Sequence, residues 1–157
     1  MNIFVLDNDP QTAAIYHTDK HVVKMILESA QIMSTNLRLF DINIGYKITH
    51  INHPCTVWAR QSLSNWLWLG SLAYYLNEEY KYRFNHTENH KSFDIILTLP
   101  WPICIPNIGL TPFAQAMPEE YRDEYNAVKA YRNYYINEKN NLFKWSKRPI
   151  PNWIISQ

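Results

Sequence analysis

The chain has 157 residues, of which 46% are hydrophobic and 18% charged, and its formal net charge at pH 7 is +1. This composition is typical of a globular protein with a sizeable core and excludes a disordered chain, while the near-neutral charge excludes a uniformly basic protein that coats nucleic acid. Only three glycines occur, which argues against a glycine-rich phosphate-binding loop.

Targeting signals are not evident. No apolar run reaches the roughly 18 residues of a membrane-spanning helix, and the opening "MNIFVLDNDP" has neither a basic start nor a cleavage site. We therefore expect a cytoplasmic protein without a membrane partner. The two cysteines, Cys55 and Cys104, lack metal-type spacing and are expected to be free thiols.

The first half of the chain predicts an extended arm followed by helices. Residues 2–6 are long enough only for an edge strand or an arm, and "DNDP" then starts a short helix with a capping aspartate and a proline at its first position. Apolar residues of helical period indicate a second helix from Thr18 or Asp19 to about Leu39. A long helix is expected from Pro54 to about Phe84.

The second half predicts shorter helices around a rigid loop. A short helix is expected to be capped near Thr87 and stopped by Pro100, and the four prolines within residues 101–118 indicate an ordered loop. The acidic run within residues 119–124 is expected to begin the last helical segment. The sequence thus predicts a mostly α protein, with one compact helical domain over residues 1–157.

Polar residues form a stripe along the second predicted helix. His21, Lys24, Glu28 and Gln31 are spaced 3, 4 and 3 residues apart, and Lys20 lies one turn before Lys24. One interpretation is a solvated face with a Lys24–Glu28 pair worth about 0.3–0.5 kcal/mol. The other is the wall of a site, in which a lysine is the amine nucleophile and Glu28 the acid/base. In that case alanine at Lys24 or Glu28 should abolish function with little change in melting temperature.

The segment "THINHPC" allows several interpretations. His50, His53 and Cys55 are residue types that bind zinc, but their spacing matches no standard zinc finger, so neither a metal nor a cofactor is expected. A structural interpretation makes Asn52 the cap of the following helix, with Pro54 in its first turn.

Functional interpretations of this region involve phosphate and base recognition. His53 and Arg60, near the start of a helix, suit a phosphate group. Trp58, close to the same turn, and Trp101, in the proline-rich loop, are candidates to stack on a base.

Long motifs of the chain resemble a known group of proteins. They are "LDNDPQTAAIYHTDKHVVKMILESAQIMST", "THINHPCTVWAR", "LNEEYKYRF", "GLTPFAQAMPEEY" and "AVKAYRNYYINEKNNLFKW". In these motifs the chain resembles an uncharacterised family of proteins from bacteriophages and other DNA viruses. That family is distantly similar to the pyrimidine dimer DNA glycosylases, the endonuclease V-like repair enzymes.

The distant similarity has specific implications. Glycosylases of this kind share a "D-K/R-x-x-x-K" helix carrying a glutamine, an "N-H-P" turn leading into a tryptophan-containing helix, and a mostly α domain. They form a Schiff base between an N-terminal α-amine and the sugar, assisted by a helix glutamate. Because methionine is removed efficiently only before small residues, the Met-Asn start implies that Lys20 or Lys24 supplies the amine here. The matching positions are Asp19, Lys20, Lys24, Gln31, Asn52, His53, Pro54 and Trp58.

The sequence therefore predicts a viral DNA-acting protein, either a DNA glycosylase-like enzyme, with or without lyase activity, or a DNA base-modifying enzyme. Two alternatives stay open, a non-catalytic protein that sequesters a nucleotide signal and a protein that binds a host partner. The expected ligand is DNA or a nucleotide. The candidate catalytic residues are Lys20, Lys24, Glu28 and His53. The candidate binding residues are His21, Gln31, Asn52, Trp58, Arg60 and Trp101.

Overall fold

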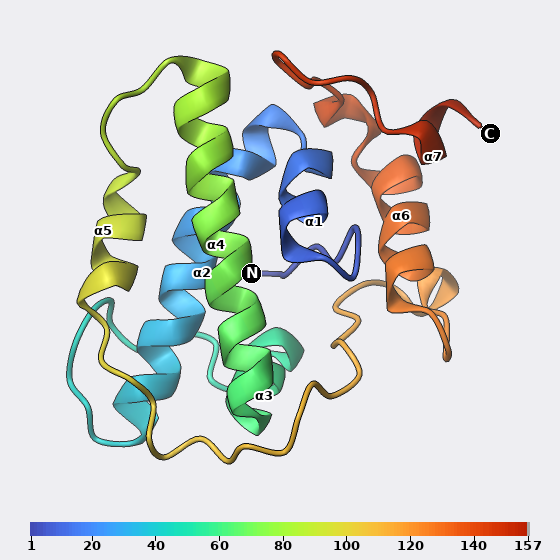
Figure 1. Cartoon of the computed structure of the whole chain (residues 1–157). Coiled ribbons are helices and arrows are strands. Elements are labelled where there is room, and N and C mark those ends of the chain that lie inside the picture. Colours follow the sequence, from blue (N-terminus) through green and yellow to red (C-terminus); the bar gives the residue numbers. More distant parts are fainter. Residues whose placement is uncertain (157) are drawn as a thin grey trace.

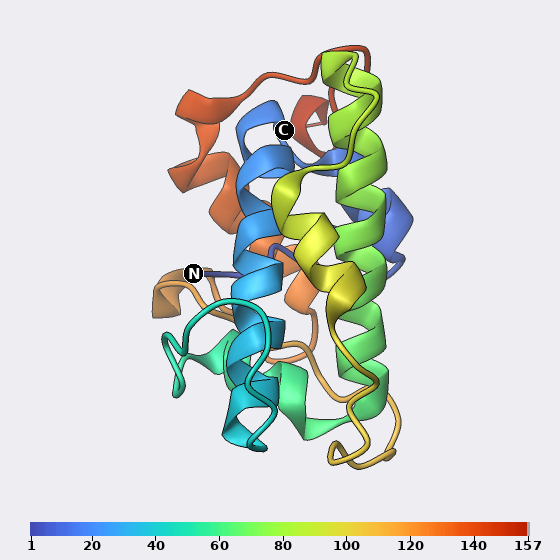
Figure 2. The same cartoon turned by 90° about the vertical axis from the view of Figure 1, so that its left-hand side faces the viewer.

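The computed structural model describes residues 1–156, and within that range its regular elements are all helical (Figure 1). This confirms the predicted mostly α fold. The two longest helices, α2 and α4, pack side by side and are flanked by α1, α3 and α5 (Figures 1 and 2). The elements are α1 (Pro10–Tyr16), α2 (Asp19–Leu39), α3 (Pro54–Gln61), α4 (Leu63–Phe84), α5 (Lys91–Thr98), the 3-10 turn η1 (Glu119–Tyr121), α6 (Ala127–Glu138), the 3-10 turn η2 (Asn140–Leu142) and α7 (Asn152–Ile155).

The first two helices begin where the sequence predicts. Asp9 caps α1 by accepting a hydrogen bond from the Thr12 N–H at 2.8 Å, and Pro10 occupies the first helical position. Thr18 precedes α2 in an extended conformation, and the helix runs to Leu39 as expected.

The predicted long helix from Pro54 to Phe84 is wrong, because the chain forms two helices that meet at Ser62. Ser62 is extended, with φ −150° and ψ 145°, and its Oγ accepts a hydrogen bond from the Ser64 N–H that caps α4. The same hydroxyl donates to the Gly109 carbonyl across the fold. Apolar periodicity continues through this break, so the pattern alone does not reveal it.

The cap of α3 also differs from the prediction. His53, and not Asn52, is the N-cap, and its Nδ1 accepts a hydrogen bond from the Cys55 N–H at 3.2 Å. Asn52 is exposed one residue earlier. A histidine ring in its neutral form can cap a helix in the way an asparagine does.

The later helices start further along than predicted. α5 begins at Lys91 with His90 as its cap, three residues beyond Thr87. The acidic run forms only the short turn η1, and α6 starts at Ala127, capped by Asn126. Residues 99–118 contain no helix, as the proline spacing predicts.

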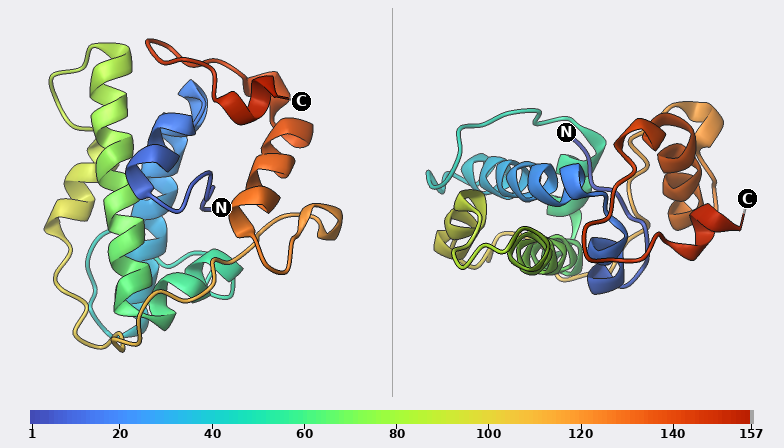
Figure 3. Two further views of the ribbon diagram at one scale, coloured as in Figure 1. Left: turned by 45° about the vertical axis from the view of Figure 1, so that its right-hand side comes forward. Right: turned by 90° about the horizontal axis from the view of Figure 1, so that it is seen from above.

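The N-terminal arm is a buried part of the core. It has no strand partner within the described residues, yet Ile3, Phe4, Val5 and Leu6 are at most 4% exposed. Figure 3 shows the arm passing between the helices α1–α5 and the C-terminal helix α6. The Phe4 ring stacks on His21 of α2 with ring centres 4.5 Å apart and packs edge-on against Tyr135 of α6 at 5.3 Å, so the arm joins the two parts of the molecule.

A buried cluster of charges joins α4 to the start of α2 and to the C-terminal segment. The Arg83 guanidinium, 3% exposed, donates to Glu79 at 2.7 Å and to Asp19 at 3.2 Å. It also donates to the backbone carbonyls of Ile15 and His17, where α1 ends. Each nitrogen of the guanidinium therefore has an acceptor inside the protein.

None of the helices in the described part of the chain combines the length and the apolar character needed to span a bilayer.

We predict that Arg83→Met lowers the free energy of unfolding by about 3–5 kcal/mol, because the buried Asp19 carboxylate loses its ion-pair partner and the buried Glu79 carboxylate keeps only Arg148. Urea denaturation monitored by circular dichroism measures the change. The matched control is Lys81→Met, which removes the more exposed pair with Glu78 and should cost less than about 1 kcal/mol. Equal small losses in both variants would contradict this role of Arg83.

Acid should destabilise the protein through two core histidines. Burial lowers the pKa of His17 to about 4 and that of His21 to about 3. Between these values and the ordinary histidine pKa of 6.5, both rings stay neutral in the folded state but take up protons in the unfolded chain. Stability is therefore complete above about pH 6.5 and falls as pH decreases, by about 2 kcal/mol per histidine at pH 5. Urea titrations at pH 7.5, 6 and 5 measure the slope. His21→Phe should reduce it, whereas exchange of the exposed His86 should not.

Candidate functional site

Glu28 lies where the N-terminal arm meets the middle of α2. Its side chain is 9% exposed, and Oε2 accepts a hydrogen bond from the Asn2 N–H at 2.7 Å. The α-amino group of Met1 is 3.8 Å from the same oxygen, and Lys24 Nζ is 3.5 Å from Oε1. Figure 2 shows the N-terminus beside the middle of α2. Two amines thus share one sheltered carboxylate.

His53 belongs to the same neighbourhood. Its pKa is lowered, first by burial and then by the positive charge of the Met1 α-amine, while the negative charge of Glu28 acts in the opposite direction. The ring therefore stays neutral at physiological pH, and its Nδ1 is occupied as the cap of α3. His53 is close enough to the amine–carboxylate group to influence it electrostatically.

Asn2 holds the arm in register at this site. Its side-chain amide donates to the Ala116 carbonyl at 2.9 Å, and its Oδ1 accepts a hydrogen bond from the Tyr131 hydroxyl at 3.0 Å. The Cys55 thiol lies 3.6 Å from the same oxygen, and burial raises its pKa to about 11, so this cysteine is no nucleophile at neutral pH. Sequence reasoning missed Asn2 and Tyr131, and it set the N-terminal amine aside in favour of a lysine, although the Met1 amine lies beside Glu28. The only hint is a polar Asn2 in an otherwise apolar arm.

The structure divides the predicted polar stripe. Lys24 and Glu28 meet, as their i, i+4 spacing predicts, but Lys20 is exposed and makes no contact with Glu28. Gln31 is half-buried further along α2. His21 is buried, and its Nδ1 lies 2.7 Å from the Tyr135 hydroxyl. The solvated-face interpretation therefore describes the two lysines but not Glu28 or His21.

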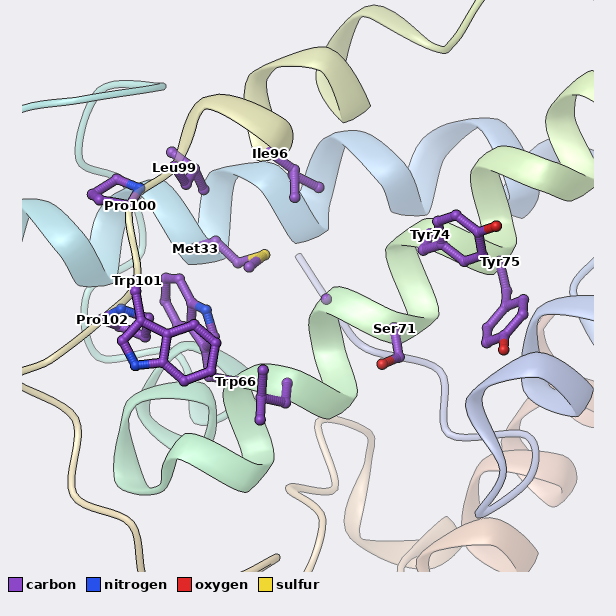
Figure 4. A pocket seen from close by; sticks show the side chains of 12 residues that line it. Met33, Trp66, Ser71, Tyr74, Tyr75, Ile96, Leu99, Pro100, Trp101 and Pro102 are labelled. Carbon is purple, nitrogen blue, oxygen red and sulfur yellow. The ribbon is translucent and has the colours of Figure 1, made fainter.

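The remaining candidates lie elsewhere. Trp58 is 2% exposed and packs edge-on against Trp68, so neither face of its ring is open to a base. Arg60 donates to the Ile51 carbonyl at 2.8 Å and to Asn36 at 3.3 Å, and thereby holds the loop before α3. Trp101 is 59% exposed and lines a separate cavity, which Figure 4 shows between α2, α4 and α5.

The residue types that commonly bind metals are dispersed over the fold. Within residues 1–156, no three His, Cys, Asp or Glu side chains lie close enough together to hold a metal ion. His17 is in the core, with its Nδ1 2.7 Å from the Ala13 carbonyl, and Cys104 is exposed in the proline-rich loop.

Comparisons of the chain with protein-family models, with curated proteins and with solved structures found no match.

We predict that Glu28→Ala lowers the free energy of unfolding by about 1–3 kcal/mol, because the part-buried Asn2 N–H loses its acceptor. Glu28→Gln keeps an oxygen at that position and should lose less. The expectation that alanine leaves the melting temperature nearly unchanged therefore holds only for Lys24, whose side chain is 58% exposed, and not for the buried Glu28. Urea denaturation distinguishes the variants, and Gln31→Ala, on the same helix, serves as the control. If alanine and glutamine at position 28 are equally stable, the hydrogen bond to the arm is not needed.

Proposed function

We propose that the protein acts on DNA as a DNA glycosylase-like or base-modifying enzyme, with its reaction centre at Glu28. One observation carries the proposal, namely a carboxylate sheltered from solvent that faces both the Lys24 amine and the Met1 α-amine. An amine beside a carboxylate is the arrangement required for attack on a sugar carbon. The sequence resemblance to pyrimidine dimer glycosylases independently favours the same chemistry.

The roles of the groups follow from their chemistry. A neutral amine attacks C1′ of the deoxyribose, the glycosidic bond breaks, and the base leaves with the bonding electron pair and takes up a proton from water. Glu28 accepts the proton that the attacking amine loses and passes it to O4′ as the C1′–O4′ bond breaks. The carboxylate regained in this way then stabilises the cationic iminium by its negative charge. The neutral His53 ring adds no competing positive charge beside this centre.

Either of two amines can serve as the nucleophile. Lys24 Nζ is 3.5 Å and the Met1 α-amine 3.8 Å from the carboxylate, whereas Lys20 makes no contact with Glu28. The arm that carries Met1 is held in place by the hydrogen bonds of Asn2, whereas the Lys24 side chain is 58% exposed.

Basic residues lie on the adjoining surface. Besides burial, which is the main cause, the positive charges of Lys20, Lys24 and Lys139 lower the pKa of His21, so all three lysines lie within electrostatic range of this residue. The Lys144 carbonyl accepts a hydrogen bond from the Asp19 N–H, so the basic C-terminal segment passes beside the start of this helix. Such a group of lysines suits the phosphate backbone of DNA.

Borohydride trapping tests the chemistry. A duplex carrying an aldehydic abasic site should become covalently attached to the wild-type protein upon reduction, and Glu28→Gln should reduce the rate by at least about 100-fold, because it removes the proton acceptor. Lys91→Ala is the matched control, since Lys91 is exposed at the start of α5, away from Glu28. Trapping that survives Lys24→Ala but not acetylation of the α-amine assigns the nucleophile to Met1. Intact mass shows whether this amine is free.

Binding provides a second readout that does not depend on Schiff base formation. Fluorescence anisotropy should show tighter binding to a duplex with an abasic-site analogue than to the intact duplex, with affinity decreasing as salt is raised. If micromolar protein binds neither duplex and no adduct is trapped, the proposed activity on DNA is wrong.

A further inference from the structure

A cavity of about 380 Å³ lies on the opposite side of α2 from Glu28. Met33 lines it, and Met33 follows Glu28 by five residues, which corresponds to about 140° around the helix. The other walls come from α4, α5 and the proline-rich loop, as Figure 4 shows. The volume falls within the range of small-molecule sites.

Gly70 keeps this cavity open. It lies in the interior of α4, where glycine destabilises a helix relative to alanine. Gly45 and Gly109 both have positive φ, which explains their presence, but Gly70 has helical backbone. A Cβ at position 70 would only touch the end of Met33, at 3.8 Å, so packing does not require glycine either. The missing side chain instead leaves space in the cavity wall.

The lining is aromatic and uncharged. Trp66 and Trp101 flank one end, where Trp101 stands between Pro100 and Pro102, whose rings restrict the backbone on both sides. No side chain that carries a formal charge at neutral pH lines the cavity, and residues 95–118, which include this loop, contain no charged residue. A phosphate or carboxylate therefore has no partner here.

Several polar atoms of the lining lack partners. Ser71 Oγ, the Tyr74 hydroxyl and the indole N–H groups of Trp66 and Trp101 make no side-chain hydrogen bond to any of residues 1–156, although the cavity is otherwise apolar. An aliphatic occupant, such as the side chains of a docked helix, would leave these groups unsatisfied. A ring with polar edge atoms would satisfy them, while its face stacks on an indole.

We propose that this cavity binds a small molecule with an uncharged, planar heteroaromatic ring, of the nucleobase or nucleoside class. The ring stacks on Trp101, and its edge bonds with Ser71 and an indole N–H. This inference goes beyond the proposed function and does not depend on it, because the two sites lie on different faces of α2.

Titration of the protein with adenosine and thymidine tests the proposal, read by quenching of tryptophan fluorescence and by ligand-detected NMR. At least one nucleoside should bind saturably, and its 5′-monophosphate should bind no more tightly, because no cation lines the cavity. Trp101→Ala should weaken binding by about tenfold or more through loss of stacking. Gly70→Ala should raise the melting temperature and weaken binding at the same time, and Gly70→Leu should abolish it.

The matched control is Ile108→Ala, in the same loop and 67% exposed but outside the lining, which should leave nucleoside binding unchanged. Absence of saturable binding of both nucleosides at millimolar concentration, or equal binding by wild type, Trp101→Ala and Gly70→Ala, would overturn the inference. A concentration-dependent increase in mass that Trp101→Ala removes would identify the cavity as an interface between copies of the chain, and would overturn it as well. None of these outcomes bears on trapping at Glu28, so the two proposals fail independently.

Discussion

The buried guanidinium of Arg83 is the constraint on which the arrangement of the helices depends. A cation inside a protein must have its charge and its hydrogen-bond donors matched there, and α4 alone supplies only Glu79. Asp19, at the start of α2, and the carbonyls at the end of α1 provide the rest. Because Glu79 also pairs with Arg148, the C-terminal segment is drawn into the same cluster. Four separate parts of the chain thus meet at one charge.

This cluster also determines which way the rest of α2 faces. Asp19 is directed toward Arg83, and Glu28 follows nine residues later, which corresponds to about 180° around a helix. Glu28 therefore lies on the face away from α4, against the N-terminal arm. Two acidic residues of one helix consequently have different environments. Asp19 completes the hydrogen bonding of the buried Arg83 guanidinium. Glu28 faces two amines, and the position of the Met1 amine depends on how the N-terminal arm is held.

The two faces of α2 offer opposite kinds of chemistry. The face at Glu28 is charged and gathers amines around a carboxylate, whereas the face at Met33 borders an uncharged aromatic cavity. The two histidines near α2 also differ in their surroundings, and no sequence motif predicts the difference. His21 is a core residue stacked on Phe4, whereas His53 is only partly buried beside the Met1 amine. Burial is the main cause of the lowered pKa in both, and the charge of the Met1 amine adds to it at His53.

The sequence by itself determined what depends on neighbouring residues along the chain. The Asp9 cap, the extent of α2, the Lys24–Glu28 contact and the helix-free proline-rich loop all follow from local hydrogen bonding and helical spacing. Only the tertiary structure decided which side chains are buried. Trp58 and His21 look like ligand-binding residues in the sequence but lie in the core. Asn2, whose N–H donates to Glu28 and thereby holds the arm there, is 26 residues away from it in the chain. Burial depends on which elements pack together. A buried charge such as Arg83 favours one packing, because its partners lie far apart in the sequence and no local pattern connects them.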